Sequence, residues 1–263
     1  MGVVNVTPDS FSDGGRHIER EAALRHALSL AAAGAEVVDI GGESTRPGAE
    51  PVSEAEELDR VVPLVEAIRA RSAVAISVDT MKPAVARAAV AAGAGWWNDV
   101  TALRERPDSL EAAAGLGCEV VLMHMRGEPR TMQAAPRYDD VVAEVCAFLQ
   151  ARAEAALAAG VARERIWLDP GIGFGKDLGH NLALLANLDR VAALGFPVLL
   201  GVSRKRFIRA IDRTAEDPGD RLGGSLACAI LGAEAGCKAL RVHDVRETVQ
   251  ALEVWRAVRG AKP

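Results

Sequence analysis

Acidic and amide side chains recur in this sequence directly after short apolar runs. Asp79, Asn98 and Asp169 each follow such a run. Their oxygens and amide groups suit a flat heterocycle with ring N–H and amino groups, because one carboxylate can accept two parallel N–H bonds. Each acid alone could equally be the N-cap of a following helix. Together the three side chains predict a site for a polar aromatic ligand.

A second set of side chains is cationic. Ser-Arg-Lys at 203–205 follows another apolar run, and Arg241 and His243 are two residues apart, so that in a strand both project to the same side. Arginine binds phosphate through two parallel hydrogen bonds. A lone cation in a loop is usually solvated, but this grouping, together with Arg46, predicts an anion site.

The segment DPGIGFGK (169–176) has the glycine content of a phosphate-binding loop but not its pattern. Lys176 stands where G-x-G-x-x-G requires its third glycine, and Asp177 follows where a Walker motif requires Ser or Thr. No strand-borne set of His, Asp and Glu has metal-ligand spacing, which argues against a caged zinc ion. A Mg²⁺ held mainly by substrate phosphates and by one or two protein oxygens stays open.

These side chains need a scaffold that brings strand ends together. Apolar, β-branched runs alternate with Ala/Leu-rich stretches of helical period, which indicates a parallel sheet buried on both faces. The expected strands are 2–6, 36–42, 73–79, 95–100, 119–124, 165–171, 197–203 and 239–244. The expected helices are 19–33, 53–70, 83–92, 108–116, 139–159, 180–194, 222–235 and 245–258.

Eight such units in 263 residues predict an α/β fold of the (β/α)8 TIM-barrel type, as a single domain over 1–263. An open, doubly wound sheet is the alternative. In a barrel, function gathers at the C-terminal ends of the strands. Nearly every expected strand delivers a polar group there, from Asn5 at the first to His243 at the last, which predicts one functional rim.

Composition limits the partners of the protein. A formal net charge of −5 argues against nucleic acid, because binding to the phosphate backbone requires a basic surface. No apolar run reaches the ~18 residues of a membrane span, and the N-terminal sequence lacks a signal-peptide pattern. The four cysteines form no C-x-x-C pair, which is typical of buried thiols in a cytoplasmic protein.

The sequence resembles the dihydropteroate synthase family over essentially its whole length. The resembling segments are NVTPDSFSDGG (5–15), DIGGESTRPGA (39–49), SVDT (77–80), NDV (98–100), LMHMRG (122–127), LDPGIGFGK (168–176), GVSRKRFI (201–208) and RVHDV (241–245). The first two are long and highly specific, and all eight occur in order.

The resemblance implies a transferase of folate (tetrahydrofolate) biosynthesis. It would condense 7,8-dihydropterin-6-ylmethyl diphosphate with 4-aminobenzoate to 7,8-dihydropteroate and pyrophosphate. The implied pterin contacts are Asp79, Asn98, Asp169 and Lys205. The implied diphosphate contacts are Arg241 and His243, with Mg²⁺ on Asn5. Thr45 and Arg46 would meet both the diphosphate and the second substrate. Around 4-aminobenzoate the resemblance places Phe11, Pro47, Phe174 and Ser203. It assigns catalysis to Lys205, Asp169 and Arg241, with Asp13 beside the developing cation.

The same resemblance implies a homodimer and a target for sulfonamides, because Phe11 and Pro47 keep the residues common in the family. Two other functions are compatible with a pterin site on this barrel. One is a methyltetrahydrofolate-dependent methyltransferase, which would not need the aminobenzoate loops or the Arg/His diphosphate end. The other is a non-catalytic pterin-binding paralogue, which should have lost some of the reactive groups that are present here.

Overall fold

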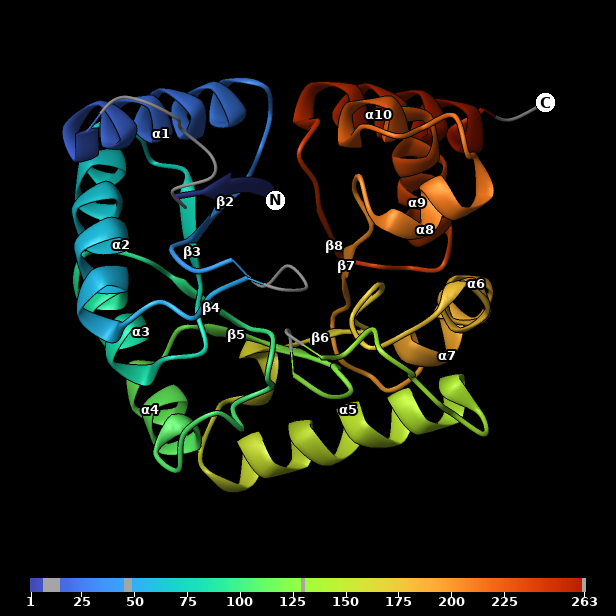
Figure 1. Cartoon of the computed structure of the whole chain (residues 1–263), viewed down its shortest axis with the longest axis horizontal. Coiled ribbons are helices and arrows are strands. Elements are labelled where there is room, and N and C mark those ends of the chain that lie inside the picture. The colour runs from blue at the N-terminus through green and yellow to red at the C-terminus, as the bar shows by residue number, and fades with distance from the viewer. Residues whose placement is uncertain (7–14, 45–48, 129–130, 262–263) are drawn as a thin grey trace.

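Strands and helices alternate along the computed structural model, which describes residues 1–6, 15–44, 49–128 and 131–261. The strands are β1 (Gly2–Asn5), β2 (Val37–Gly41), β3 (Ala75–Asp79), β4 (Trp96–Asp99), β5 (Glu119–Met123), β6 (Ile166–Asp169), β7 (Leu199–Gly201) and β8 (Ala239–Arg241). The helices are α1 (Gly15–Ala32), α2 (Glu54–Arg69), α3 (Pro83–Ala91), α4 (Ser109–Leu116), α5 (Val141–Ala158), α6 (Leu178–Ala186), α7 (Leu188–Ala192), α8 (Arg206–Ile211), α9 (Leu222–Glu234) and α10 (Val245–Gly260). Figure 1 shows the helices as an outer layer around the strands.

The strands form a parallel barrel. A continuous ladder runs from β1 to β6, and β7 pairs with β8. Two parallel bridges connect these pieces, Leu168 with Val198 between β6 and β7, and Gly2 with Val242 between β1 and the end of β8. The Val3 amide donates to the Val242 carbonyl over 3.0 Å. Pairing therefore continues around the whole circuit, which confirms the predicted TIM barrel over an open sheet.

All eight expected strands are present; one expected helix was wrong, and one observed helix was not expected. The stretch expected as one helix over 180–194 is divided into α6 and α7, because Asn187 has φ −129° and its side-chain amide donates to the Ala183 carbonyl. The short helix α8 was not expected. It follows β7 directly and lacks the several turns over which a helical period can be recognised in a sequence.

Burial explains why the strand sequences are apolar throughout. Ile40 on β2, Val78 on β3 and Trp97 on β4 are each fully buried in the core. Helix α2 covers this side of the barrel with Val61, Leu64, Val65 and Ile68. Ser53 is its N-cap, since its Oγ accepts from the Glu56 amide over 3.2 Å. Among the described residues, no helix is long and apolar enough to cross a membrane.

Candidate active site

The parallel register brings polar groups of β1, β3 and β4 to one end of the barrel. Asn5 is paired with Gly41, Gly41 with Asp79, and Asp79 with Asn98. A Cβ on Gly41 would lie 3.6 Å from Asn5 Oδ1 and 3.9 Å from Asp79 Oδ2. The two oxygens therefore converge over a position that carries no side chain.

Arg241 joins this rim from β8 and connects two acids. Its Nε lies 2.6 Å from Asp39 Oδ2, and its Nη2 lies 2.7 Å from Asp79 Oδ2. Asn98 Nδ2 donates to the same Asp39 oxygen over 3.2 Å. Asp39 is fully buried, and within the described part of the chain its other oxygen, Oδ1, has no hydrogen-bond partner. The sequence predictions missed Asp39, although a lone acid inside the apolar run of β2 was a usable signal.

A second cluster lies where β6, β7 and β8 meet. A Cβ on Gly201 would lie 3.8 Å from both Asp169 Oδ2 and Lys205 Nζ, and 3.9 Å from Arg241 Cβ. Asp169 Oδ1 accepts from the amide of Gly171 over 2.7 Å. The predicted groups Asp169, Lys205 and Arg241 are thus brought together around a second glycine.

Two contacts from the β6–α6 loop position Lys205. Its Nζ donates to the carbonyl of Ile172, and it lies 4.7 Å from the ring centroid of Phe174. Phe174 in turn packs against an apolar cluster of Val100, Met123, Met125 and Met132, which the sequence predictions did not include. The methionines give this end of the barrel an adaptable apolar surface.

Ser203 and His243 lie beside the second cluster. The Ser203 hydroxyl accepts from the His243 amide over 3.2 Å and lies 3.1 Å from its Nδ1. Arg204 does not join the predicted cationic group, because its Nε donates to Asp244 over 2.9 Å in an ion pair. Of the cations predicted for an anion site, Lys205, Arg241 and His243 therefore remain as candidates among the described residues.

Burial changes the pKa values of the clustered groups. Desolvation raises the pKa of Asp79 to about 7, with Arg241 opposing and Asp39 adding to the rise. Desolvation also lowers the pKa of Lys205 to about 8, while Asp169 opposes. The pKa of Asp169 is raised, again mainly by burial. The pKa values of Asp79 and Lys205 lie near neutrality, which is typical of functional sites.

The remaining predicted site residues lie outside the described residues. They are Phe11, Asp13, Thr45, Arg46 and Pro47, from the segments after β1 and β2. Among the described residues, no cluster of three or more His, Cys, Asp or Glu side chains could hold a metal ion.

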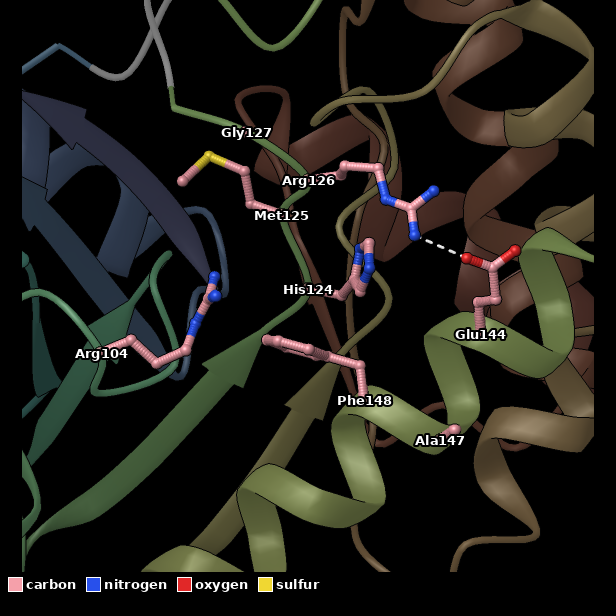
Figure 2. A pocket seen from close by; sticks show the side chains of 8 residues that line it. All are labelled: Arg104, His124, Met125, Arg126, Gly127, Glu144, Ala147 and Phe148. Carbon is pink, nitrogen blue, oxygen red and sulfur yellow. Dashed lines mark hydrogen bonds and ion pairs between the residues drawn. The ribbon is translucent and has the colours of Figure 1, made fainter. Parts of the chain in front are cut away.

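A cavity of about 410 Å³ lies beside β5 (Figure 2). In Figure 2 the imidazole of His124 lies between Arg126, which is paired with Glu144, and the ring of Phe148 on α5. Arg104 also lines the cavity and lies over the Phe148 ring. None of the site residues predicted from the sequence lines it.

The fold and the rim together define an α/β-barrel protein in which acidic, amide and cationic side chains converge at one end of the barrel. The sequence matches the family described as pterin binding enzyme over residues 1–243. It is 52% identical over 262 residues to the dihydropteroate synthase of Escherichia coli strain K12, covering 100% of this chain and 92% of that protein. The chain therefore belongs to the pterin-binding enzymes and, within them, to the dihydropteroate synthase family.

Solved structures agree with this assignment. The Xanthomonas albilineans dihydropteroate synthase with 4-aminobenzoic acid is 55% identical, with a TM-score of 0.94, covering 100% of this chain and 93% of that chain. The complex of the synthase from the same organism with 7,8-dihydropteroate has a TM-score of 0.90 at 52% identity, covering 100% and 94% of the two chains.

Proposed function

We propose that this protein is a transferase that condenses 7,8-dihydropterin-6-ylmethyl diphosphate with 4-aminobenzoate, giving 7,8-dihydropteroate and pyrophosphate in folate biosynthesis. The observation that carries the proposal is the convergence of Asp79, Asn98, Asp169, Lys205 and Arg241 at one barrel rim. The relatives named above, at 52–55% identity over the whole chain, support the same activity.

The pterin ring would be held by the acids and the amide. Asp169 and Asp79 offer carboxylate oxygens to ring N–H and amino groups, and Asn98 offers both a donor and an acceptor. Lys205 lies beside Asp169 and would bind a ring acceptor. Because these groups are already fixed by neighbouring contacts, little of their freedom is lost on binding.

The diphosphate would be bound by cations that lie next to these pterin groups. In this structure the Arg241 Nη2 is paired with Asp79. When Asp79 accepts bonds from the ring, we expect this edge of the guanidinium to turn to the diphosphate, while Nε stays on Asp39. His243 would donate to the same anion, and Thr45 and Arg46 would reach it from the segment after β2.

The donor chemistry of the rim fits one Mg²⁺. Asn5 Oδ1 and Asp79 Oδ2 both point to the space above Gly41. Mg²⁺ is commonly bound by one or two protein oxygens together with phosphate oxygens and water. We propose that Asn5 holds the ion. When bound, it would supply positive charge next to the departing diphosphate.

The reaction itself needs positioning more than proton transfer. The bond from the methylene carbon to the diphosphate oxygen breaks, and its electron pair leaves on the oxygen, whose charge Arg241 and His243 neutralise. Asp13 is proposed to stabilise the cation left on the methylene carbon. The neutral amine of 4-aminobenzoate, held near Phe11, Pro47, Phe174 and Ser203, then forms the C–N bond, and the proton of the resulting ammonium passes to water. An arylamine is neutral at pH 7, so no strong base is required.

A pyrophosphate-release assay tests the function. We expect release from the pterin diphosphate to require 4-aminobenzoate, and a sulfonamide to raise the apparent KM for the arylamine substrate without changing kcat. A methyltetrahydrofolate-dependent methyltransferase would release no pyrophosphate, and a non-catalytic pterin-binding paralogue would bind the pterin without turnover. Either result would refute the proposal.

The pKa of Asp79 predicts a pH effect on stability. Since this pKa rises from about 3.8 to about 7 on folding, the folded chain keeps a proton between these values that the unfolded chain has lost. The Asp79 contribution to the free energy of unfolding is therefore greatest below pH 4 and is lost as the pH rises to about 7. Urea denaturation at pH 5 to 8 measures this slope. The Asp79→Asn variant should have a flatter slope, and an unchanged slope would contradict the assignment.

The same group should control ligand affinity. Only the ionised carboxylate accepts two N–H bonds, so we expect the affinity for a pterin ligand to fall by roughly tenfold per pH unit below about 7. Isothermal titration measures it. Affinity independent of pH between 5 and 7 would show that Asp79 is not an acceptor for the ring.

We also propose a cytoplasmic homodimer. Leu182, Ile211 and Leu231, on α6, α8 and α9, are 41%, 60% and 48% exposed, around a groove of about 730 Å³. An apolar face of this kind is typical of a surface that binds another protein, and a second copy of this chain is the occupant we propose. Light scattering should give twice the mass of one chain for the wild type and the mass of a single chain for the Leu231→Glu variant.

The proposed location in the cytoplasm rests on the cysteines. All four are free thiols, which suits a reducing compartment.

A further inference from the structure

Lys176 is a buried amine that the proposed reaction does not use. It lies in the β6–α6 loop and is only 2% exposed. Its Nζ donates to the carbonyls of Gly171 and Phe174 over 2.9 and 3.0 Å, and lies 2.9 Å from His124 Nδ1 and 3.3 Å from the His124 carbonyl. Burial lowers the pKa of Lys176 well below its ordinary value, although Asp169 opposes this effect, so these short contacts with acceptors are what satisfies the amine at this buried position. Lysine is almost never buried so completely without partners that satisfy it.

The β6–α6 loop, whose carbonyls Lys176 binds, packs directly against the backbone of the segment after β5. Gly171 and Gly175 have φ values of +65° and +62°. A Cβ on Gly171 would lie 1.9 Å from the His124 carbonyl oxygen, and one on Gly175 would lie 2.2 Å from that of Arg126. Residues 171–175 therefore lie against the segment after β5 at a distance that only glycine allows.

The remaining partner of Lys176 is His124, which directly follows β5 and packs against α5. The His124 ring meets the Phe148 ring of α5 edge-on, with 4.8 Å between centroids (Figure 2). Desolvation lowers the pKa of His124 to about 3, and Lys176 adds to this effect. His124 is therefore a neutral ring whose Nδ1 can accept from Lys176. The Lys176 amine thus connects the β6–α6 loop to His124 after β5, and His124 in turn packs against α5.

The same loop also positions Lys205. Lys176 binds the carbonyls on either side of Ile172, at Gly171 and Phe174, and the Ile172 carbonyl is the acceptor for Lys205 Nζ. Phe174 places its ring 4.7 Å from the same Nζ. A shift of the loop would move both contacts of Lys205 together.

We propose that Lys176 is a positioning residue for the reaction: by holding residues 171–174 against His124, it places the Ile172 carbonyl and the Phe174 ring that orient Lys205. The inference rests on the proposed function. Beyond that function, the proposal is that the Lys176 amine, which does not touch substrate, affects kcat/KM. Removing the Lys176 amine would leave buried acceptors, such as the Phe174 carbonyl and His124 Nδ1, without this donor.

The test replaces Lys176 with Met, which keeps the length of the side chain and removes its donors. The matched control is Lys238→Met, because Lys238 is exposed and precedes β8 at the opposite end of the barrel. For both variants and the wild type we would measure kcat, the KM for each substrate, and thermal unfolding. We expect Lys176→Met to lower kcat/KM by about 10- to 100-fold, the range for a displacement of about 1 Å in a reactive group, and Lys238→Met to match the wild type.

A double-variant comparison separates positioning from general destabilisation. If Lys176 acts through Lys205, the Lys176→Met change should weaken the affinity for a pterin ligand in the wild-type background but not in the Lys205→Met background. Equal loss in both backgrounds would overturn the proposal, as would a Lys176→Met enzyme with wild-type kcat/KM. If Lys176→Met does not fold, Lys176→Gln, which keeps two donors, takes its place under the same criteria. If the wild type releases no pyrophosphate, the proposed function fails instead.

Discussion

Replacing Asp169 with Asn is expected to lower kcat/KM by about 10²- to 10³-fold while the barrel stays folded. Asp169 is 4% exposed, and its Oδ1 already accepts from the Gly171 amide. An amide in its place presents a donor to the donors of the pterin ring. The loss of two charge-assisted hydrogen bonds costs about 3–4 kcal/mol, which corresponds to this change in rate. Steady-state kinetics with the pyrophosphate assay measures it.

Stability should change little in this variant. Because burial raises the pKa of Asp169, its charge opposes folding, and the neutral amide relieves that cost. The matched control is Asp189→Asn at an exposed position of α7, which should have wild-type kinetics. Kinetics within about threefold of the wild type for Asp169→Asn would rule out the assigned role.

Replacing Arg241 with Met is expected to reduce both stability and activity. Arg241 pairs with the fully buried Asp39 and with Asp79. Removing one partner from a buried ion pair leaves uncompensated charge, which typically costs about 3–5 kcal/mol. The diphosphate also loses its guanidinium, so that pyrophosphate release should fall by at least about 10²-fold. Urea denaturation and the release assay measure the two effects.

Removing the Asp39 charge tests whether the loss of the ion pair explains the lower stability. In the Arg241→Met background, Asp39→Asn should recover part of the lost stability but none of the activity, because it removes the unpaired charge without restoring the cation. Arg259→Met on α10 is the control, since that side chain is 64% exposed. If Asp39→Asn lowers stability further, the ion pair is not the cause.

The barrel could be predicted from the sequence because its signals are local. Each strand is a short apolar run buried on both faces, and each following helix has its own amphipathic period. The error over 180–194 arose where the period continues through Asn187, whose side-chain bond to Ala183 interrupts the helix. The strand ends were predictable too, since parallel strands carry their C-terminal residues to one rim.

The site was predictable only in part. Asp79, Asn98, Asp169, Lys205 and Arg241 were identified as strand-end groups, and the structure brings them together. Asp39 was missed because it lies inside β2 rather than at its end, and its role depends on Arg241, which is 202 positions away in the sequence. No local pattern reports such a pair.

The sequence by itself therefore determined the fold class, the rim and the kinds of groups on it, because apolar period and residue chemistry are properties of neighbouring residues. The tertiary structure decided which groups touch. It paired Arg241 with Asp39 and Asp79, turned Arg204 away to Asp244, and enclosed Lys176 among carbonyls of two loops. These contacts join residues far apart in the chain, and only the closed barrel brings them within hydrogen-bond distance.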